Sequence, residues 1–162
     1  MMATIMAGCA NHKQEYKAAD GSACAVLDER SGKWTITGAD GREVVTDYDS
    51  MRVTEVGEDG HPMTIVYYKA NRETLIQYYS SMTMRARGDL TDGKRDGLWQ
   101  FFFEDGSLQA EASYVDGRED GPYRVLRENG VPYYIGQYSA GARTGTWEIY
   151  DPEGNLSQKI EY

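Results

Sequence analysis

Short apolar and aromatic runs alternate with glycine-containing turn signals along the C-terminal half of the chain. From Asp92 to Tyr162 the sequence reads DGKRDGLWQFFFEDGSLQAEASYV, then DGREDGPYRVLRENGVPYYIGQYS, then AGARTGTWEIYDPEGNLSQKIEY. Glycines, central aromatic residues and closing tyrosines recur every 24 residues: Gly93, Gly117 and Gly141; Trp99, Tyr123 and Trp147; Gly106, Gly130 and Gly154; Tyr114, Tyr138 and Tyr162. This pattern is an internal repeat, and it indicates architecture more clearly than chemistry.

Each repeat predicts a β-hairpin. The turn signals Asp105-Gly106, Asn129-Gly130 and Glu153-Gly154 lie between apolar runs, where a two-residue type I′ turn needs the positive φ that glycine adopts. With such loops the expected cross-strand pairs are Phe103–Leu108, Phe101–Ala110, Trp99–Ala112 and Gly97–Tyr114, and in the third repeat Trp147–Ile160 and Gly145–Tyr162. A second set of turns, at Asp92-Gly93, Asp116-Gly117 and Ala140-Gly141, joins the hairpins. We therefore expect an all-β fold, an antiparallel β-hairpin meander that forms an elongated or curled sheet.

The same pattern continues in weaker form toward the N-terminus. Residues 30–34, RSGKW, resemble residues 95–99, RDGLW, and Asp40-Gly41 follows Trp34 at the interval that separates Trp99 from its own turn glycine. Residues 63–68 have the branched and aromatic content of a strand. We expect one β-meander domain over residues 25–162, with degenerate repeats over 25–91 and three clear repeats over 92–162, preceded by a polar segment over 1–24.

The repeats resemble the MORN repeat, in particular the bacterial MORN-variant units of the YwqK-like antitoxin family, which look like DGKxDGxWxxYxxxGxLxxxxxY. The matching residues of the first unit are Asp92-Gly93-Lys94-Arg95-Asp96-Gly97-Leu98-Trp99 with Gly106, Leu108 and Tyr114, and the three units cover 71 of the 162 residues. The resemblance implies a sheet of hairpin repeats that is used for interaction. It implies no reaction.

Alternation along the predicted strands divides the aromatic residues between two faces. One face carries Trp99, Phe101, Phe103, Leu108 and Tyr114, and we expect it to close over the core. The other carries Phe102, Leu126 and Tyr150 among charged residues, with Tyr133 and Ile135 in the middle repeat and Tyr78 as an extension. This second set is either a ladder that stiffens a single-layer sheet or an apolar stripe, bordered by charges, that binds a partner.

The charge of the chain limits its partners. The formal net charge is −9, from 26 acidic and 17 basic residues. Nucleic acid and anionic lipid are themselves negative, so binding through bulk electrostatics is disfavoured for both. The charge is compatible with a protein partner that has a cationic surface.

The first residues suggest a lipid anchor. Ile5-Met6-Ala7-Gly8-Cys9 resembles a bacterial lipobox, in which the cysteine becomes the lipidated first residue. No basic segment precedes it and the apolar segment is shorter than the ~7–15 residues of a signal peptide, so either the true start lies upstream or the match is chance. We favour lipidation of Cys9, which is then the link to a membrane, and expect Cys24 to be buried at the start of a strand. A Cys9–Cys24 disulfide is the alternative.

Candidate catalytic chemistry is sparse. His12 and His61 lie in no recognisable motif with a serine or cysteine, and no zinc, phosphate-loop or dinucleotide motif is present. Carboxylates crowd the predicted turns: Asp89, Asp92, Asp96, Asp105, Asp116 and Asp120. Several such oxygens are what a calcium site needs, but aspartate before glycine is also what tight turns select by themselves. We expect no enzyme activity, no cofactor and no metal.

The leading hypothesis is a non-enzymatic protein-interaction or scaffold module, displayed as a cell-envelope lipoprotein that binds a protein partner through an aromatic sheet face. The alternative is a cytoplasmic antitoxin-like protein that neutralises a basic toxin. A glycan hydrolase with turn carboxylates such as Asp96 and Asp120 is disfavoured, because no repeat gains a distinctive acid pair.

Overall fold

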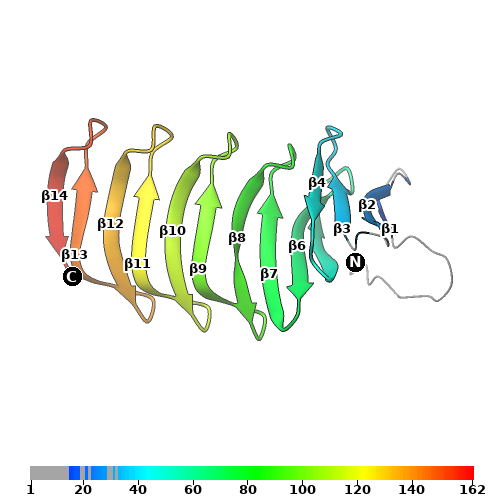
Figure 1. The fold of residues 1–162 in the computed structure, drawn as a ribbon. Helices are drawn as coiled ribbons and strands as arrows, with labels where there is room; N and C mark the ends of the chain where they lie inside the picture. Colours follow the sequence, from blue (N-terminus) through cyan, green and yellow to red (C-terminus); the bar gives the residue numbers. More distant parts are fainter. Residues whose placement is uncertain (1–14, 19–20, 22, 29–30, 32) are drawn as a thin grey trace. The chain divides into compact units, whose positions relative to one another are not determined.

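A computed structural model describes residues 15–18, 21, 23–28, 31 and 33–162. The described part contains strands and turns without a helix, and each pairing between its strands is antiparallel, so the predicted all-β hairpin meander is confirmed (Figure 1). The chain divides into two compact units, Met1–Met84 and Arg85–Tyr162. Each unit has its own way of burying aromatic side chains.

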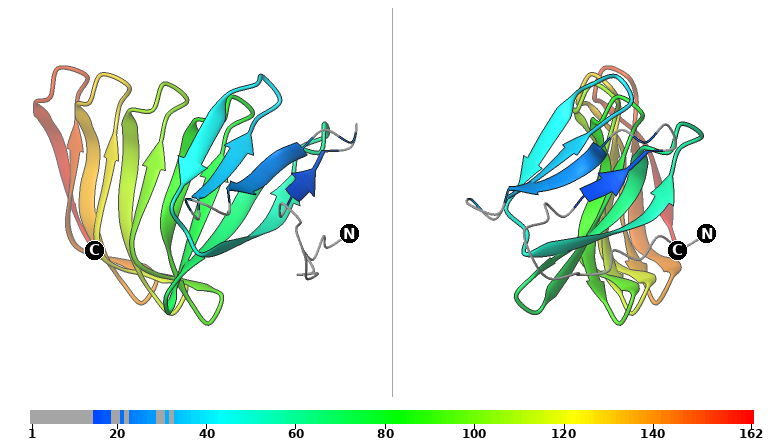
Figure 2. Two further views of the ribbon diagram at one scale, coloured as in Figure 1. Left: turned by 45° about the vertical axis from the view of Figure 1, so that its right-hand side comes forward. Right: turned by 90° about the vertical axis from the view of Figure 1, so that its right-hand side faces the viewer.

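The N-terminal unit has two layers. One layer is a sheet with the order β1-β2-β3-β4, and the other is formed by β5, β6 and β7, which pair with one another in chain order. The strands are β1 (Glu15–Lys17), β2 (Ala23–Asp28), β3 (Lys33–Thr37), β4 (Glu43–Thr46), β5 (Ser50–Val56), β6 (Pro62–Lys69) and β7 (Arg72–Tyr78). Figure 2 shows the four-stranded sheet as a layer across β5–β7. Sheets that pack face to face bury the inward residues of both.

One core joins the two layers. Its buried members are Ala25, Trp34, Ile36, Met51, Val53, Ile65, Tyr67, Ile76, Tyr78 and Met82. The hydroxyls of Tyr67 and Tyr78 lie 2.9 Å apart in a hydrogen bond inside this core. Burial raises the pKa of Tyr78 to about 12 and also holds the pKa of Tyr67 above its ordinary range.

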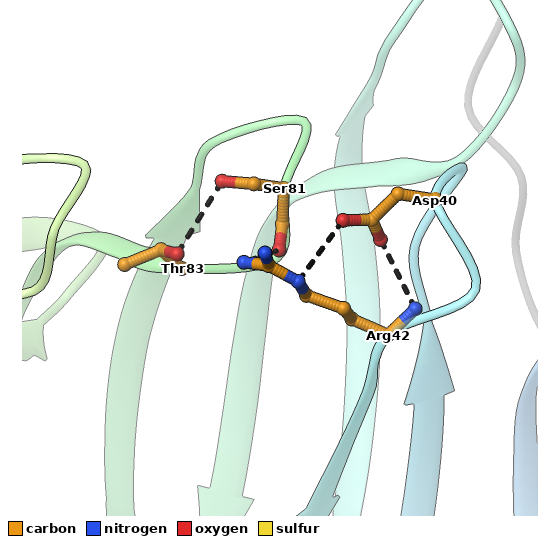
Figure 3. Close-up of polar contacts among 4 residues, drawn as sticks. All are labelled: Asp40, Arg42, Ser81 and Thr83. Carbon is orange, nitrogen blue, oxygen red and sulfur yellow. Dashed lines mark hydrogen bonds and ion pairs between the residues drawn. The ribbon is translucent and has the colours of Figure 1, made fainter.

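A contact between two turns closes the layers at one end (Figure 3). Arg42 Nη1 donates to the Ser81 carbonyl oxygen at 3.4 Å, and Asp40 lies 3.2 Å from Arg42 Nε. Gly38 allows the close approach, since a Cβ there would lie 2.1 Å from Cγ of Met82. Residues 39 positions apart in the sequence are thereby held together.

The C-terminal unit is a single sheet whose strands follow in chain order (Figure 1). Its strands are β8 (Met84–Thr91), β9 (Lys94–Phe102), β10 (Leu108–Val115), β11 (Arg118–Leu126), β12 (Pro132–Ser139), β13 (Ala142–Tyr150) and β14 (Leu156–Glu161). Successive repeats are tied at their turns, where the Gly117 amide donates to Arg95 O at 2.9 Å and the Gly141 amide to Glu119 O at 2.8 Å. Within this unit no strand packs on either face of the sheet.

The turn types differ from the prediction. The loops around Gly106 and its equivalents have three residues: the Phe103 amide donates to Ser107 O and the Gly106 amide to Phe103 O, both at 2.9 Å. Two-residue loops with positive φ at both positions occur instead between repeats, as at Asp92-Gly93 with φ of 51° and 74°. The Asp105 carboxylate accepts the Ser107 amide at 2.8 Å, which favours the longer loop.

The longer loop changes one cross-strand pair. Phe101–Ala110, Trp99–Ala112, Gly97–Tyr114 and Trp147–Ile160 pair as predicted, and the Tyr162 amide donates to Gly145 O at 3.1 Å. The predicted Phe103–Leu108 pair is wrong, because Leu108 pairs with Phe102 next to a register shift. The turn predicted at Asp40-Gly41 is confirmed as the same three-residue kind.

The structure describes part of the predicted polar segment over residues 1–24, but not the predicted lipidation site. Cys9 lies outside the described residues. Glu15–Lys17 form β1, and Cys24 is fully buried in β2, as predicted, with its thiol 3.5 Å from the Tyr16 carbonyl oxygen. In the described part of the chain, no helix is long and apolar enough to cross a membrane.

Candidate interaction faces of the C-terminal unit

The two faces of the C-terminal sheet differ in chemistry. The face that carries Trp99 and Trp147, here called the tryptophan face, has mostly apolar side chains at paired positions in the middle of the strands. They are Ala86, Phe101, Ala110, Val125, Tyr134, Ile149 and, on the last strand, the polar Gln158. The charged face carries a largely polar row: Arg87, Gln100, Glu111, Arg124, Ile135, Glu148 and Lys159. At the middle of the strands, one face of the sheet is therefore mostly apolar and the other mostly polar.

On the tryptophan face, Trp99 and Trp147 are buried although the sheet has one layer. Their side chains are 0% and 3% exposed. Each indole lies on a glycine of the preceding strand: a Cβ at Gly88 would be 2.3 Å from the Trp99 ring, and a Cβ at Gly136 would be 2.3 Å from the Trp147 ring. Each indole Nε1 donates to a backbone carbonyl of that strand, at Asp89 and Gln137, both at 3.1 Å.

An arginine covers the outer side of each indole. The guanidinium carbon of Arg95 lies 4.3 Å from the centroid of Trp99, and that of Arg143 lies 4.6 Å from the centroid of Trp147. Each arginine also donates to the closing tyrosine of its repeat, Tyr114 at 3.1 Å and Tyr162 at 2.8 Å. Hydrogen bonding to Tyr138 and Tyr162 raises the pKa of Arg143 above its ordinary value, so this group stays cationic.

The middle repeat departs from this arrangement. Glu119 stands where the other repeats have arginine, Tyr123 stands where they have tryptophan, and Ala112 stands where they have the supporting glycine. A smaller ring and a larger support together keep the volume of the pair similar. Tyr114 Oη donates to a carboxylate oxygen of Glu119 at 3.5 Å. Along the sheet, the equivalent residues Arg95, Glu119 and Arg143 are therefore positive, negative and positive.

The charged face is organised by ion pairs. Arg124 Nη2 lies 2.7 Å from Glu111 Oε2, and the Gln100 amide nitrogen donates to Glu111 Oε1 at 2.9 Å. Lys159 lies 2.7 Å from Glu148, which also accepts the Tyr150 hydroxyl at 2.6 Å. Both contacts hold the pKa of Glu148 below its usual value. The pairs neutralise the centre of this face.

The predicted stripe lies beside these ion pairs. Phe102, Leu126 and Tyr150 occupy the same position in the repeat on β9, β11 and β13, and each is half-buried. Ile135 is also half-buried and pairs with Arg124 and Glu148 within the polar row.

The cross-strand partners of the stripe are Leu108, Pro132 and Leu156. The prediction that Leu108 lies on the face of Trp99 is wrong, because the register shift between Leu108 and Ala110 interrupts the alternation. Pro132 and Leu156 were not considered in the prediction. A sequence signal for these pairs was present. Asp105 and Asp151 favour three-residue loops by accepting backbone amides, and a three-residue loop gives the observed pairing.

Two residues predicted for the stripe lie elsewhere. Tyr78 is 2% exposed in the core of the N-terminal unit, because the second layer covers its strand there. The rings of the successive residues Tyr133 and Tyr134 have centroids 3.8 Å apart, so strict alternation fails beside the register shift at Leu126. Tyr133 instead packs under Arg127, 4.2 Å from its guanidinium carbon, at the turn end of the hairpin.

The turn carboxylates serve the turns in the described structure. Asp40 and Asp59 accept the backbone amide two residues later, both at 3.0 Å, as Asp105 does. Among the residues that the structure describes, no group of three or more His, Cys, Asp or Glu side chains is arranged to hold a metal ion.

Comparison with known proteins supports the repeat. Residues 95–116 and 143–162 match the family model described as MORN repeat variant. The middle repeat, which carries Glu119 and Tyr123, lies outside the match. No curated protein matches the chain. Repeats of the matched kind are generally modules that interact with proteins or membranes, and generally not enzymes.

Proposed function

We propose that the protein is a non-enzymatic interaction module that binds a protein partner through an apolar row on the charged face of its C-terminal sheet. The apolar row consists of Phe102, Leu108, Leu126, Pro132, Tyr150 and Leu156. One observation carries the proposal: these side chains occupy paired positions on six strands, beside ion pairs that border them. An apolar centre with a polar rim is the usual composition of a protein interface.

The exposure of the row supports this use. Leu156 is 47% exposed, and Phe102, Leu126 and Tyr150 keep part of each side chain in water. Burying a partly exposed aromatic anchor under a partner contributes free energy of binding, typically more than 1 kcal/mol for each central anchor. Tyr150 combines an apolar ring with a hydroxyl already bound to Glu148, so its rotamer is fixed before binding.

Charge favours a basic partner. Residues 85–162 contain 9 basic and 14 acidic side chains, so the formal net charge of this unit is 9 − 14 = −5. Three of the basic side chains on this sheet already pair with carboxylates: Lys94, Arg124 and Lys159. The remaining acidic surface would accelerate association with a positively charged protein, and the acceleration would weaken as salt is added.

The test compares variants in one capture experiment. Tagged protein, cross-linked in its native cells, is purified as wild type, Phe102→Ser, Tyr150→Ser and Leu98→Ser. Leu98 is the matched control because it is 55% exposed on the same strand and face as Phe102 but lies off the row. A partner retained by wild type and Leu98→Ser and lost from both row variants supports the proposal. A partner retained equally by all four proteins would reject the row.

We further propose that the module is a cell-envelope lipoprotein anchored through Cys9. The support is the segment Ile5-Met6-Ala7-Gly8-Cys9. Palmitate labelling of the gene product, expressed from any in-frame upstream start, should then depend on Cys9. Unlabelled protein in the cytosol would exclude the anchor.

The acidic charge also supports a second candidate, a cytoplasmic antitoxin-like protein that neutralises a basic toxin. Both candidates use the same row. A gene for a basic toxin next to this one, with growth rescue on co-expression, would favour the second candidate. Rescue unaffected by Tyr150→Ser would separate neutralisation from the apolar row.

A further inference from the structure

We propose that the tryptophan face binds a second copy of this chain, so that two C-terminal sheets pack face to face around a two-fold axis parallel to β12. In this arrangement Glu119 of each copy faces Arg143 of the other. The interface uses the face opposite to the apolar row, so its test is independent of the proposed function.

The charges of the tryptophan face are self-complementary. Arg95, Glu119 and Arg143 are equivalent positions of the repeat on β9, β11 and β13. Strands in a sheet are ~4.8 Å apart, so successive members of this row are about 10 Å apart. A two-fold axis over β12 exchanges β11 with β13, which places the negative member of one copy against a positive member of the other at two symmetric points. Such isologous contacts are the commonest way in which proteins form dimers.

Arg143 has the capacity for this contact. Its guanidinium has five N–H donors, and Tyr138 and Tyr162 engage part of them. None of the carboxylates that the structure describes forms an ion pair with Arg143 or Arg95, although acidic side chains outnumber basic ones in the chain. Stacking on Trp147 and bonding to Tyr162 hold the exposed guanidinium in one position. A preorganised cation loses little entropy when it binds a carboxylate.

The same two-fold axis also places apolar side chains of one copy opposite apolar side chains of the other. Exchange of β11 with β13 sets Val125 against Ile149 of the second copy and Tyr123 against Trp147, while Tyr134 on β12 faces its own equivalent. All five side chains lie on the tryptophan face, and Val125, Tyr134 and Ile149 are half-buried in the single chain. Two sheets that pack in this way lie ~10 Å apart, a distance that such side chains fill.

The middle repeat acquires a role from this geometry. With arginine at all three positions, a second copy would meet like charges everywhere along the row. Glu119 is the single reversal that makes the row complementary to itself. Glu119 thereby gives the middle repeat a role at the one position of this row where it carries the opposite charge.

The experiment measures the mass of the full-length protein in solution by analytical ultracentrifugation, from micromolar to millimolar concentration. Wild type should dimerise, and added salt should weaken the dimer. Glu119→Arg and Arg143→Glu should each raise the dimer Kd at least about tenfold, because each places like charges together at two points. An equimolar mixture of the two variants should restore a heterodimer, since both contacts are then complementary again.

Two controls fix the interpretation. Arg118→Glu makes the same change of charge as Arg143→Glu. Arg118 is next to Glu119 in the chain, but its side chain alternates to the other face, so this variant should dimerise as wild type. Circular dichroism and melting check that each variant is folded. If Arg143→Glu is unfolded, Glu119→Arg alone must still raise the dimer Kd at least about tenfold. A wild type that is monomeric at every concentration would overturn the proposal. So would a Glu119→Arg protein that dimerises as wild type, or a folded pair of variants that does not recover on mixing.

Discussion

Trp34 in the N-terminal unit and Trp99 in the C-terminal unit are almost equally buried, at 1% and 0% exposed, in different surroundings. Trp34 lies between two layers, among side chains of both sheets. Trp99 lies on a single layer, between the backbone of Gly88 and the guanidinium of Arg95. The indole of Trp99 donates to Asp89 O, whereas that of Trp34 has no acceptor among the described residues.

The difference shows how a repeat sheet replaces a second layer. A glycine under the ring lets the indole lie flat on the backbone, and a cation above it keeps water from its outer side. The repeat therefore supplies each ring with a cover from its own strand. Within the C-terminal unit, no strand covers either face of the sheet, whereas in the N-terminal unit each layer buries one face against the other.

Removal of one tryptophan should give the largest difference between the units. Trp34→Ala should lower the free energy of unfolding by about 4–5 kcal/mol, because two layers enclose the cavity that remains. Trp99→Ala should cost about 3 kcal/mol, because water can enter a site that has one layer. Urea unfolding, followed by the remaining tryptophans, measures both. An equal or larger loss for Trp99→Ala would show that the C-terminal site is closed on both sides.

High pH should affect the N-terminal unit first. Burial holds the pKa of Tyr78 at about 12 and raises that of Tyr67, whereas an unfolded tyrosine ionises near pH ~10. The stabilising contribution is therefore complete below pH ~10 and is lost as the pH rises through about 12, by roughly 2–3 kcal/mol. Alkaline unfolding monitored by tyrosine absorbance measures it. Tyr78→Phe should reduce this loss, and unchanged alkaline unfolding in that variant would contradict the assignment.

The supporting glycine should tolerate no side chain. Gly136→Ala places a Cβ against the Trp147 ring and should cost about 1–3 kcal/mol through overpacking. The matched control is Ala112→Gly at the equivalent position, which should cost only ~0.5–1 kcal/mol, as glycine does in a strand. Thermal melting of the two variants gives the comparison. If Gly136→Ala melts like wild type, the indole does not rest on the backbone.

The covering cation should have the smallest effect. Arg95→Gln removes the cation above Trp99 and should cost ~0.5–1 kcal/mol, the usual range for such a contact near a surface. Arg118→Gln, an exposed arginine of the same sheet, should cost nothing measurable. Quenching of tryptophan fluorescence by acrylamide should rise for Arg95→Gln alone. Equal quenching in both variants would mean that the guanidinium does not protect the ring.

The sequence predicted the C-terminal sheet well, because glycine and aromatic spacing at 24 residues specifies where the turns lie and most of the register. It failed at Phe103 and Leu108, where the carboxylate of Asp105 selects a three-residue loop and shifts the pairing. Periodicity placed Tyr78 correctly on a strand but could not reveal the second layer that buries it. Contacts between distant segments, such as Arg42 with Ser81, leave no trace in local patterns.

The candidate site was predicted in part for the same reasons. Phe102, Leu126 and Tyr150 follow from the repeat alone, while their partners Leu108 and Leu156 depend on the loop length. The roles of Arg95 and Arg143 were missed, because the prediction expected the tryptophan face to close over a core and so did not consider what else could cover the rings.

Hydrogen exchange of the three indole N–H groups, resolved by NMR, tests most directly whether a single layer can seal its own tryptophans. The indole protons of Trp99 and Trp147 should exchange as slowly as the backbone amides of β10, since each is buried and bonded to a carbonyl oxygen. Exchange at the rate of an exposed indole, in a protein whose β10 amides stay protected, would show that the single layer leaves both rings open to water.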